Sequence, residues 1–140
     1  MASFLLAGNV NSRSFTHAER LFDILNQTLP VVHCVKYVCL DATWDAAQVQ
    51  LCKKFQFDAA AVAKVQCIVW HEDGRYIGDD VAFAEYCRNT YSVTCDLQEK
   101  QMTGITQENV AVVNKMFAES GEGTVLLPVE DVNGKVTTQY

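Results

Sequence analysis

Residues 4–30 read FLLAGNVNSRSFTHAERLFDILNQTLP, and this stretch decides the fold. Phe4–Gly8 is a short apolar run that ends at a glycine, which is typical of a buried strand. A polar loop follows, and residues 15–28 then carry apolar side chains at the spacing of an amphipathic helix. These side chains are Ala18, Leu21, Phe22, Leu25 and Leu29. Thr16–Glu19 has the spacing of a capping box and Pro30 stops the helix, so we expect a strand, a loop and a helix.

The next segment continues the alternation of strand and helix. Val31–Leu40 is rich in β-branched and aromatic residues and predicts a second strand. A second helix is expected over residues 43–56, with Asp41 or Thr43 as its cap. Its inner face would hold Trp44, Ala47, Leu51 and Phe55. The alanine-rich segment 58–64 either extends this helix or forms an irregular link.

A hairpin and a third helix come next. Val65–Trp70 predicts a strand buried on both faces. Glu72–Arg75 is a hairpin signal, since Gly74 supplies the positive φ that such turns need, and a short strand over 75–77 follows. Gly78–Asp80 then caps a helix over residues 80–91. The side chains expected on its buried side are Val81, Phe83, Ala84 and Cys87.

The predicted order is therefore β-α-β-α-β-β-α, an α/β architecture of the thioredoxin-like type. Beyond it, an extra C-terminal helix is expected over 106–119, with Val110, Val113, Met116 and Phe117 as its apolar stripe. Val129–Thr138 contains Asn133-Gly134, a two-residue hairpin signal. We therefore expect a thioredoxin/glutaredoxin-like domain over residues 1–96 and a C-terminal helix and tail over 97–140.

Charge and composition exclude several classes of partner. The 140 residues carry 17 acidic and 11 basic side chains, a net charge of −6. The densest basic spot is Lys53-Lys54, so neither nucleic acid nor an anionic membrane surface is an expected partner. The apolar start is too short for a signal-peptide core, and no apolar run reaches the ~20 residues of a membrane span. The sequence predicts a cytoplasmic location.

Six cysteines stand at 34, 39, 52, 67, 87 and 95, without a Cys-x-x-Cys pair. In a reducing compartment we expect free thiols, most of them buried among apolar neighbours. His17, His33 and His71 are scattered and lack metal-ligand spacing with a cysteine, so no metal site is expected. His17 and Ser12 lie near the start of the first helix, but no third residue completes a nucleophilic site.

The loop at Ala7–Phe15 resembles the active-site loop of glutaredoxins. A nearer likeness is to the N-terminal, thioredoxin-like domain of the "putative malate dehydrogenase 1B" family, and it covers about residues 1–110. Short stretches in register carry it: Phe4–Gly8, Leu25–Pro30, Ile68–Trp70, Phe83, Glu85, Tyr91–Thr94, Met102, Ile105 and Gln107–Asn109. The resemblance implies a link to ciliated or flagellated cells and a dehydrogenase-like domain further along such proteins. This sequence contains no Gly-x-Gly-x-x-Gly loop, so we expect no malate dehydrogenase activity from it alone.

In the glutaredoxin register the nucleophile position falls on Ser12, followed by Arg13, Ser14 and Phe15. A hydroxyl supplies no anion near neutral pH and cannot form a mixed disulfide, so this loop is degenerate and no catalytic residue is expected. The fold's cis-proline position falls at Gln66 or Cys67, where we expect a trans peptide because a non-proline cis bond costs ~3 kcal/mol. Cys67 is the thiol that would face this groove.

Three functional hypotheses remain open. The first is a redox-inactive thioredoxin-like domain for protein–protein contact, an axonemal scaffold in the setting that the resemblance implies; its interface would use 121–140. The second is a glutathione-binding or glutathione-transferase-like module, in which Asp79 and Asp80 would hold the ligand; ordinary helix capping is the alternative role of these residues. The third is a dimerisation domain of a malate-dehydrogenase-like protein, with a homodimer as the assembly. No cofactor other than glutathione is suggested.

Overall fold

The β-α-β unit predicted from the first forty residues is the centre of the fold. The computed structural model describes residues 3–29, 31–62, 64–120, 127–132 and 135–138. Strand β1 (Ser3–Asn9) leads through α1 (Arg13–Thr28) to β2 (His33–Cys39). The two strands pair in parallel, with Ser3 opposite His33 and Asn9 opposite Cys39. Parallel neighbouring strands need a crossover connection, and α1 provides it here.

Two antiparallel strands extend the sheet beyond β1. Strand β3 (Cys67–His71) pairs with β1, and β4 (Tyr76–Gly78) pairs with β3. The turn between them contains Gly74 at φ +100°, which confirms the hairpin signal. The order β4-β3-β1-β2, with β1 and β2 parallel, is that of the predicted thioredoxin-like α/β fold.

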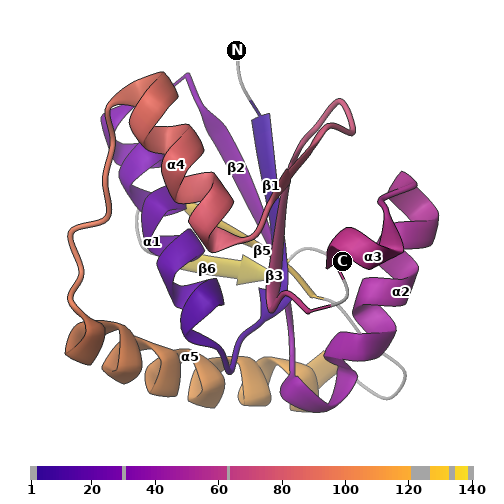
Figure 1. The fold of residues 1–140 in the computed structure, drawn as a ribbon. Helices are drawn as coiled ribbons and strands as arrows, with labels where there is room; N and C mark the ends of the chain where they lie inside the picture. The colour runs from indigo at the N-terminus through magenta and orange to yellow at the C-terminus, as the bar shows by residue number, and fades with distance from the viewer. Residues whose placement is uncertain (1–2, 30, 63, 121–126, 133–134, 139–140) are drawn as a thin grey trace.

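Helices cover both faces of this sheet (Figure 1). Helices α1 and α4 (Asp80–Tyr91) lie on one face, and α2 (Trp44–Phe55) and α3 (Ala59–Val62) lie on the other. A 3₁₀ turn, η1 (Asp41–Thr43), precedes α2. Helix α2 ends because Gln56 adopts a left-handed conformation with φ 58°, so the alanine-rich segment forms a separate short helix.

Several predicted details of the helices are wrong. Thr43 is the N-cap residue of α2, one of the two residues predicted for it, but its side chain makes no capping hydrogen bond because the hydroxyl donates to the carbonyl of Leu40. The Asp41 carboxylate accepts from Asn9. Val81 is 65% exposed, and Asp80 lies on the buried side of α4 in its place. Helix α5 (Glu99–Ser120) begins well before residue 106, although its expected apolar stripe does contact the core.

The C-terminal hairpin is also present. Strand β5 (Leu127–Val132) pairs with β6 (Lys135–Thr138), and β5 adds to the sheet beside β2. Asn133-Gly134, the predicted turn, and Pro30, the predicted helix stop, lie outside the described residues. The proposed division at residue 96 stays a prediction.

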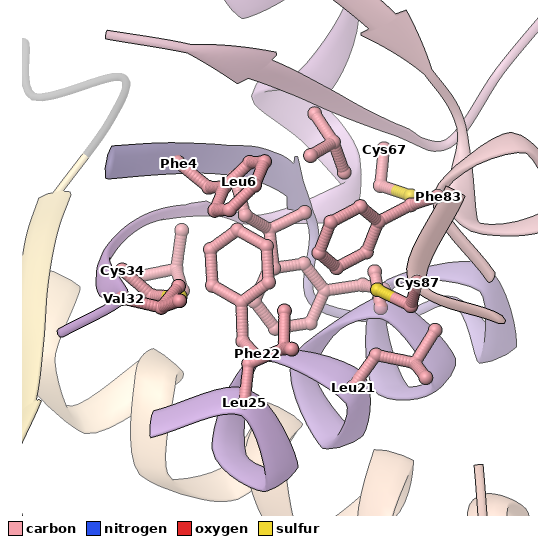
Figure 2. Close-up of a cluster of buried hydrophobic side chains, with 14 of the residues drawn as sticks. Phe4, Leu6, Leu21, Phe22, Leu25, Val32, Cys34, Cys67, Phe83 and Cys87 are labelled. Atoms are coloured by element: carbon pink, nitrogen blue, oxygen red, sulfur yellow. The ribbon is translucent and has the colours of Figure 1, made fainter. Parts of the chain in front are cut away.

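The sheet separates two buried clusters. The cluster under α1 and α4 combines aromatic and aliphatic side chains with three thiols, as Figure 2 shows. Its largest labelled members are Phe4, Leu6, Leu21, Phe22, Leu25 and Phe83, with Cys34, Cys67 and Cys87 among them. The cluster under α2 is built around Trp44, Ile68 and Trp70. Every residue of β3 is buried, as expected for a strand covered on both faces.

Candidate functional site

The loop between β1 and α1 holds the serine that the sequence places at the nucleophile position. Ser12 is the N-cap of α1, and its hydroxyl oxygen accepts the backbone N–H of Phe15 at 3.1 Å. The same hydroxyl donates to the carbonyl of Asn9 at 2.8 Å. Ser12, and not Thr16, therefore caps this helix; the Thr16 hydroxyl instead contacts that of Thr106 on α5. The Ser12 hydroxyl therefore acts both as a donor and as an acceptor, and both hydrogen bonds hold the loop to the helix.

The other three residues of the degenerate loop have separate roles. Arg13 is exposed and forms an ion pair with Glu99. The carbonyl of Ser14 accepts a weak hydrogen bond from the Cys67 thiol, with sulfur and oxygen 3.6 Å apart. Phe15 is fully buried, so its ring belongs to the core.

The Phe15 ring closes the space between the loop and the sheet. A Cβ atom placed on Gly8 would lie 2.5 Å from Cδ2 of Phe15 and 2.9 Å from Cβ of Cys67. The Gly8 backbone is therefore packed closely against Phe15 and Cys67, at the place where a thioredoxin-like groove would lie beside the loop. Cys67, which the sequence places at this groove, is buried.

Asn9, at the end of β1 beside this loop, has a structural role that the sequence analysis missed. Its buried side-chain amide donates to Asp41 at 2.7 Å and to Gln66 at 3.0 Å, while its amide oxygen accepts the backbone N–H of Asn11 at 3.0 Å. It therefore joins the ends of β1 and β2 to the residue before β3. The peptide bonds of the described residues are all trans, so the peptide joining Gln66 and Cys67 is trans as predicted.

The two aspartates considered for glutathione both have protein partners. Asp79 is the N-cap of α4 and accepts the backbone N–H of Ala82 at 3.1 Å, which confirms the capping interpretation for this residue. The Asp80 side chain is 5% exposed and its Oδ2 lies 2.7 Å from Nδ1 of His17 on α1. Within the described part of the chain no hydrogen bond joins His17 to Ser12. Glutathione binding stays a prediction.

Burial suppresses the acidity of most of the thiols. It raises the pKa of Cys34, Cys39 and Cys87 to about 12. The pKa of Cys67 lies well above its ordinary value because of burial, and the nearby Asp80 and Asp79 carboxylates raise it further. The pKa of Cys52 is also raised by burial. A thiol with a raised pKa is mostly protonated at neutral pH and is a poor nucleophile.

The described residues supply neither a metal cluster nor a membrane span. The six cysteines are free thiols, as predicted. In the described ranges no group of three or more His, Cys, Asp or Glu side chains is placed to hold a metal ion. Those ranges also contain no helix with the length and apolar character needed to cross a bilayer.

Fold and site together define a class: a thioredoxin-like α/β domain in which a serine caps the first helix and the loop is packed against the sheet. Comparison with known proteins gives the family. The chain belongs to the family described as "Putative malate dehydrogenase 1B N-terminal domain", whose model matches residues 3–124. The resemblance drawn from the sequence is confirmed, and it extends beyond residue 110.

Two curated relatives carry the name "Putative malate dehydrogenase 1B". The one from Branchiostoma floridae is 30% identical over 125 residues, which is 85% of this chain and 23% of the relative. The one from Bos taurus is 28% identical over 133 residues, which is 89% of this chain and 27% of the relative. The chain thus spans about a quarter of the length of these relatives.

Proposed function

We propose that this chain is a redox-inactive thioredoxin-like domain that acts through contacts with other proteins. The observation that carries the proposal is the hydroxyl of Ser12, which caps α1 at the position of the expected nucleophile. Disulfide exchange begins with attack by a thiolate and passes through a mixed disulfide. An alcohol oxygen forms neither species under physiological conditions.

Cys67, which lies beside the loop, does not supply a substitute nucleophile there. It is buried, and its thiol donates to the carbonyl of Ser14. Reaction there would require the Phe15 ring and the Gly8 backbone to separate from Cys67. The packing of the core opposes that movement.

We propose the axoneme of a cilium or flagellum as the place of these contacts. The support is the family membership together with the setting that the resemblance implies. The malate dehydrogenase in the relatives' name refers to proteins about four times longer, and no dehydrogenase step is assigned to this chain.

The test is fractionation of ciliated cells that express the tagged full chain. After the membrane is removed with detergent, the chain should sediment with the axonemes and be released by high salt. The tag alone should stay in the supernatant. Recovery of the chain with soluble enzymes and never with axonemes or another large assembly would contradict the proposal.

A further inference from the structure

Helix α5 is held at its N-terminal end by ion pairs at the molecular surface. Glu99 pairs with Arg13 at the start of α1, and Asp96, just before α5, pairs with Arg20 through two contacts of 2.7 Å. Figure 1 shows α5 passing along one end of the molecule beside the start of α1. Exposed ion pairs of this kind contribute little to stability, because water and salt compete for both partners.

The surface beneath this part of α5 is polar. The Lys36 side chain, on β2, is 5% exposed, and its Nζ lies 2.9 Å from Oε2 of Glu19 on α1. The second oxygen of Glu19 accepts from the side chain of Asn109 at 3.0 Å. Thr16, which contacts Thr106, is likewise buried. The Lys36–Glu19 ion pair and the Thr16 hydroxyl therefore lie under α5, which contacts Glu19 through Asn109 and Thr16 through Thr106.

The two halves of α5 are attached differently. In the half over Glu99–Asn109, Met102 is the buried apolar side chain among polar contacts. The C-terminal half packs Val113 and Phe117 against the core. A small apolar centre with a polar rim is the composition of a non-obligate interface, whereas the interior of a domain is more uniformly apolar.

We propose that the N-terminal half of α5 is a releasable strap, and that the α1–β2 surface beneath it docks a helix of another protein. The partner would be an amphipathic helix with carboxylates at its N-terminal end, like Asp96 and Glu99. This inference deepens the proposed function and rests on it, since it names the surface through which the contact is made.

Charge complementarity selects the partner. The surface under the strap presents Arg13, Arg20 and Lys36. Its carboxylates are Glu19, which Lys36 offsets, and Asp23, which lies near Arg20. Release of the strap would take Glu99 from Arg13 and Asp96 from Arg20, so these two arginines match incoming carboxylates, in a chain whose net charge is −6. A basic helix would lose both pairs and bring a cation next to them.

The experiment uses the full chain and a fluorescent peptide that copies residues 96–112. The peptide should bind saturably, and replacement of its two carboxylates, Asp96→Asn with Glu99→Gln, should weaken binding by about tenfold or more. The variant Thr16→Cys/Thr106→Cys supplies the control, because its two thiols are placed to form a disulfide that locks the strap. Oxidised, it should not bind the peptide; reduced, it should bind the peptide saturably.

Absence of saturable binding, or equal binding by the oxidised and reduced forms, would overturn the inference. If the double variant does not fold, hydrogen exchange of the wild-type chain decides. The amides of residues 99–109 should exchange at least about tenfold faster than those of β1, and exchange at the rate of global unfolding would overturn the strap. If the chain sediments with axonemes but does not bind the peptide, the strap inference is refuted and the proposed function is not.

Discussion

Gly8 marks the closest approach of β1 to the loop, and the substitution Gly8→Ala tests how tightly that space is filled. The new methyl group would meet Phe15 and Cys67, so we expect a loss of about 1–3 kcal/mol in the free energy of unfolding. The measurement is urea denaturation. Gly104→Ala is the matched control, because nothing lies within 4 Å of its Cβ on α5 and it should stabilise by about 0.5–1 kcal/mol. Equal effects of the two changes would contradict this packing.

His71 predicts how stability depends on pH. Burial lowers the pKa of His71 below 6.5, and Arg75 lowers it further. The unfolded chain therefore takes up this proton at a higher pH than the folded chain does. The free energy of unfolding should be constant in this respect above both pKa values and should fall as pH drops through 6.5 towards the folded pKa.

Chemical denaturation at a series of pH values checks this expectation. His71→Gln should lose that part of the pH dependence, while the dependence due to other groups remains. The opposite result would be a wild-type chain whose free energy of unfolding rises as pH drops through 6.5, with that rise absent in His71→Gln. It would show that the folded chain favours protonated His71, which contradicts a lowered pKa.

The loop shows which features of single residues could be predicted. The assignment of Ser12 to the nucleophile position followed from the resemblance to the glutaredoxin loop. Its role as the cap was not predicted, because Thr16–Glu19 has the spacing of a capping box. Asn9 gave no signal at all. Its partners Asp41 and Gln66 are 32 and 57 positions away, and local pattern carries no information about contacts at that separation.

At the scale of elements, the pair of His17 and Asp80 joins α1 to α4. His17→Ala would leave the buried Asp80 carboxylate without this partner, so we expect a loss of about 1–3 kcal/mol in the free energy of unfolding. Asp80→Ala and the double variant complete a cycle measured by urea denaturation. The double variant should lose less than the two single losses together, whereas simple additivity would show that the pair is not coupled.

Helix boundaries reflect polar contacts that the apolar pattern does not contain. Helix α5 starts early because the side chain of Gln101 accepts the backbone N–H of Gln98 at 2.8 Å and Met102, in the first turns of the helix, is buried. On α4, Asp80 takes an inward position and Val81 points to solvent, since the inner face is fixed by Phe83 and Cys87. A hydrophobicity pattern assigns a valine to the core and an aspartate to the surface, which is why the prediction for Val81 failed and the burial of Asp80 was missed.

At the scale of the molecule, the topology was predictable where neighbours in sequence are neighbours in space. The β-α-β unit and the hairpin between β3 and β4 have this property. The second hairpin was predicted from Asn133-Gly134, but its place beside β2 was not, because β5 pairs with a strand about ninety residues earlier. Nothing in the local sequence pattern indicates that the hairpin joins the sheet at the β2 edge.

The pattern of thiol burial predicts how the folded chain reacts with iodoacetamide. At pH 8 we expect alkylation of Cys52 and Cys95, which are half-buried, and protection of the four buried thiols until the chain unfolds. Mass spectrometry of peptides from native and urea-treated protein measures this. Rapid alkylation of Cys67 in the native chain would contradict the close packing of the β1–α1 loop against this residue.

The most direct test of the central claim is disulfide reduction by the full chain, with hydroxyethyl disulfide and glutathione or with insulin and dithiothreitol. We predict a rate equal to that without protein, and the same rate for Ser12→Ala, since the serine oxygen cannot form a mixed disulfide. Reproducible turnover by the wild-type chain, abolished by changing one side chain among Ser12, Arg13, Ser14 and Phe15, would contradict the account.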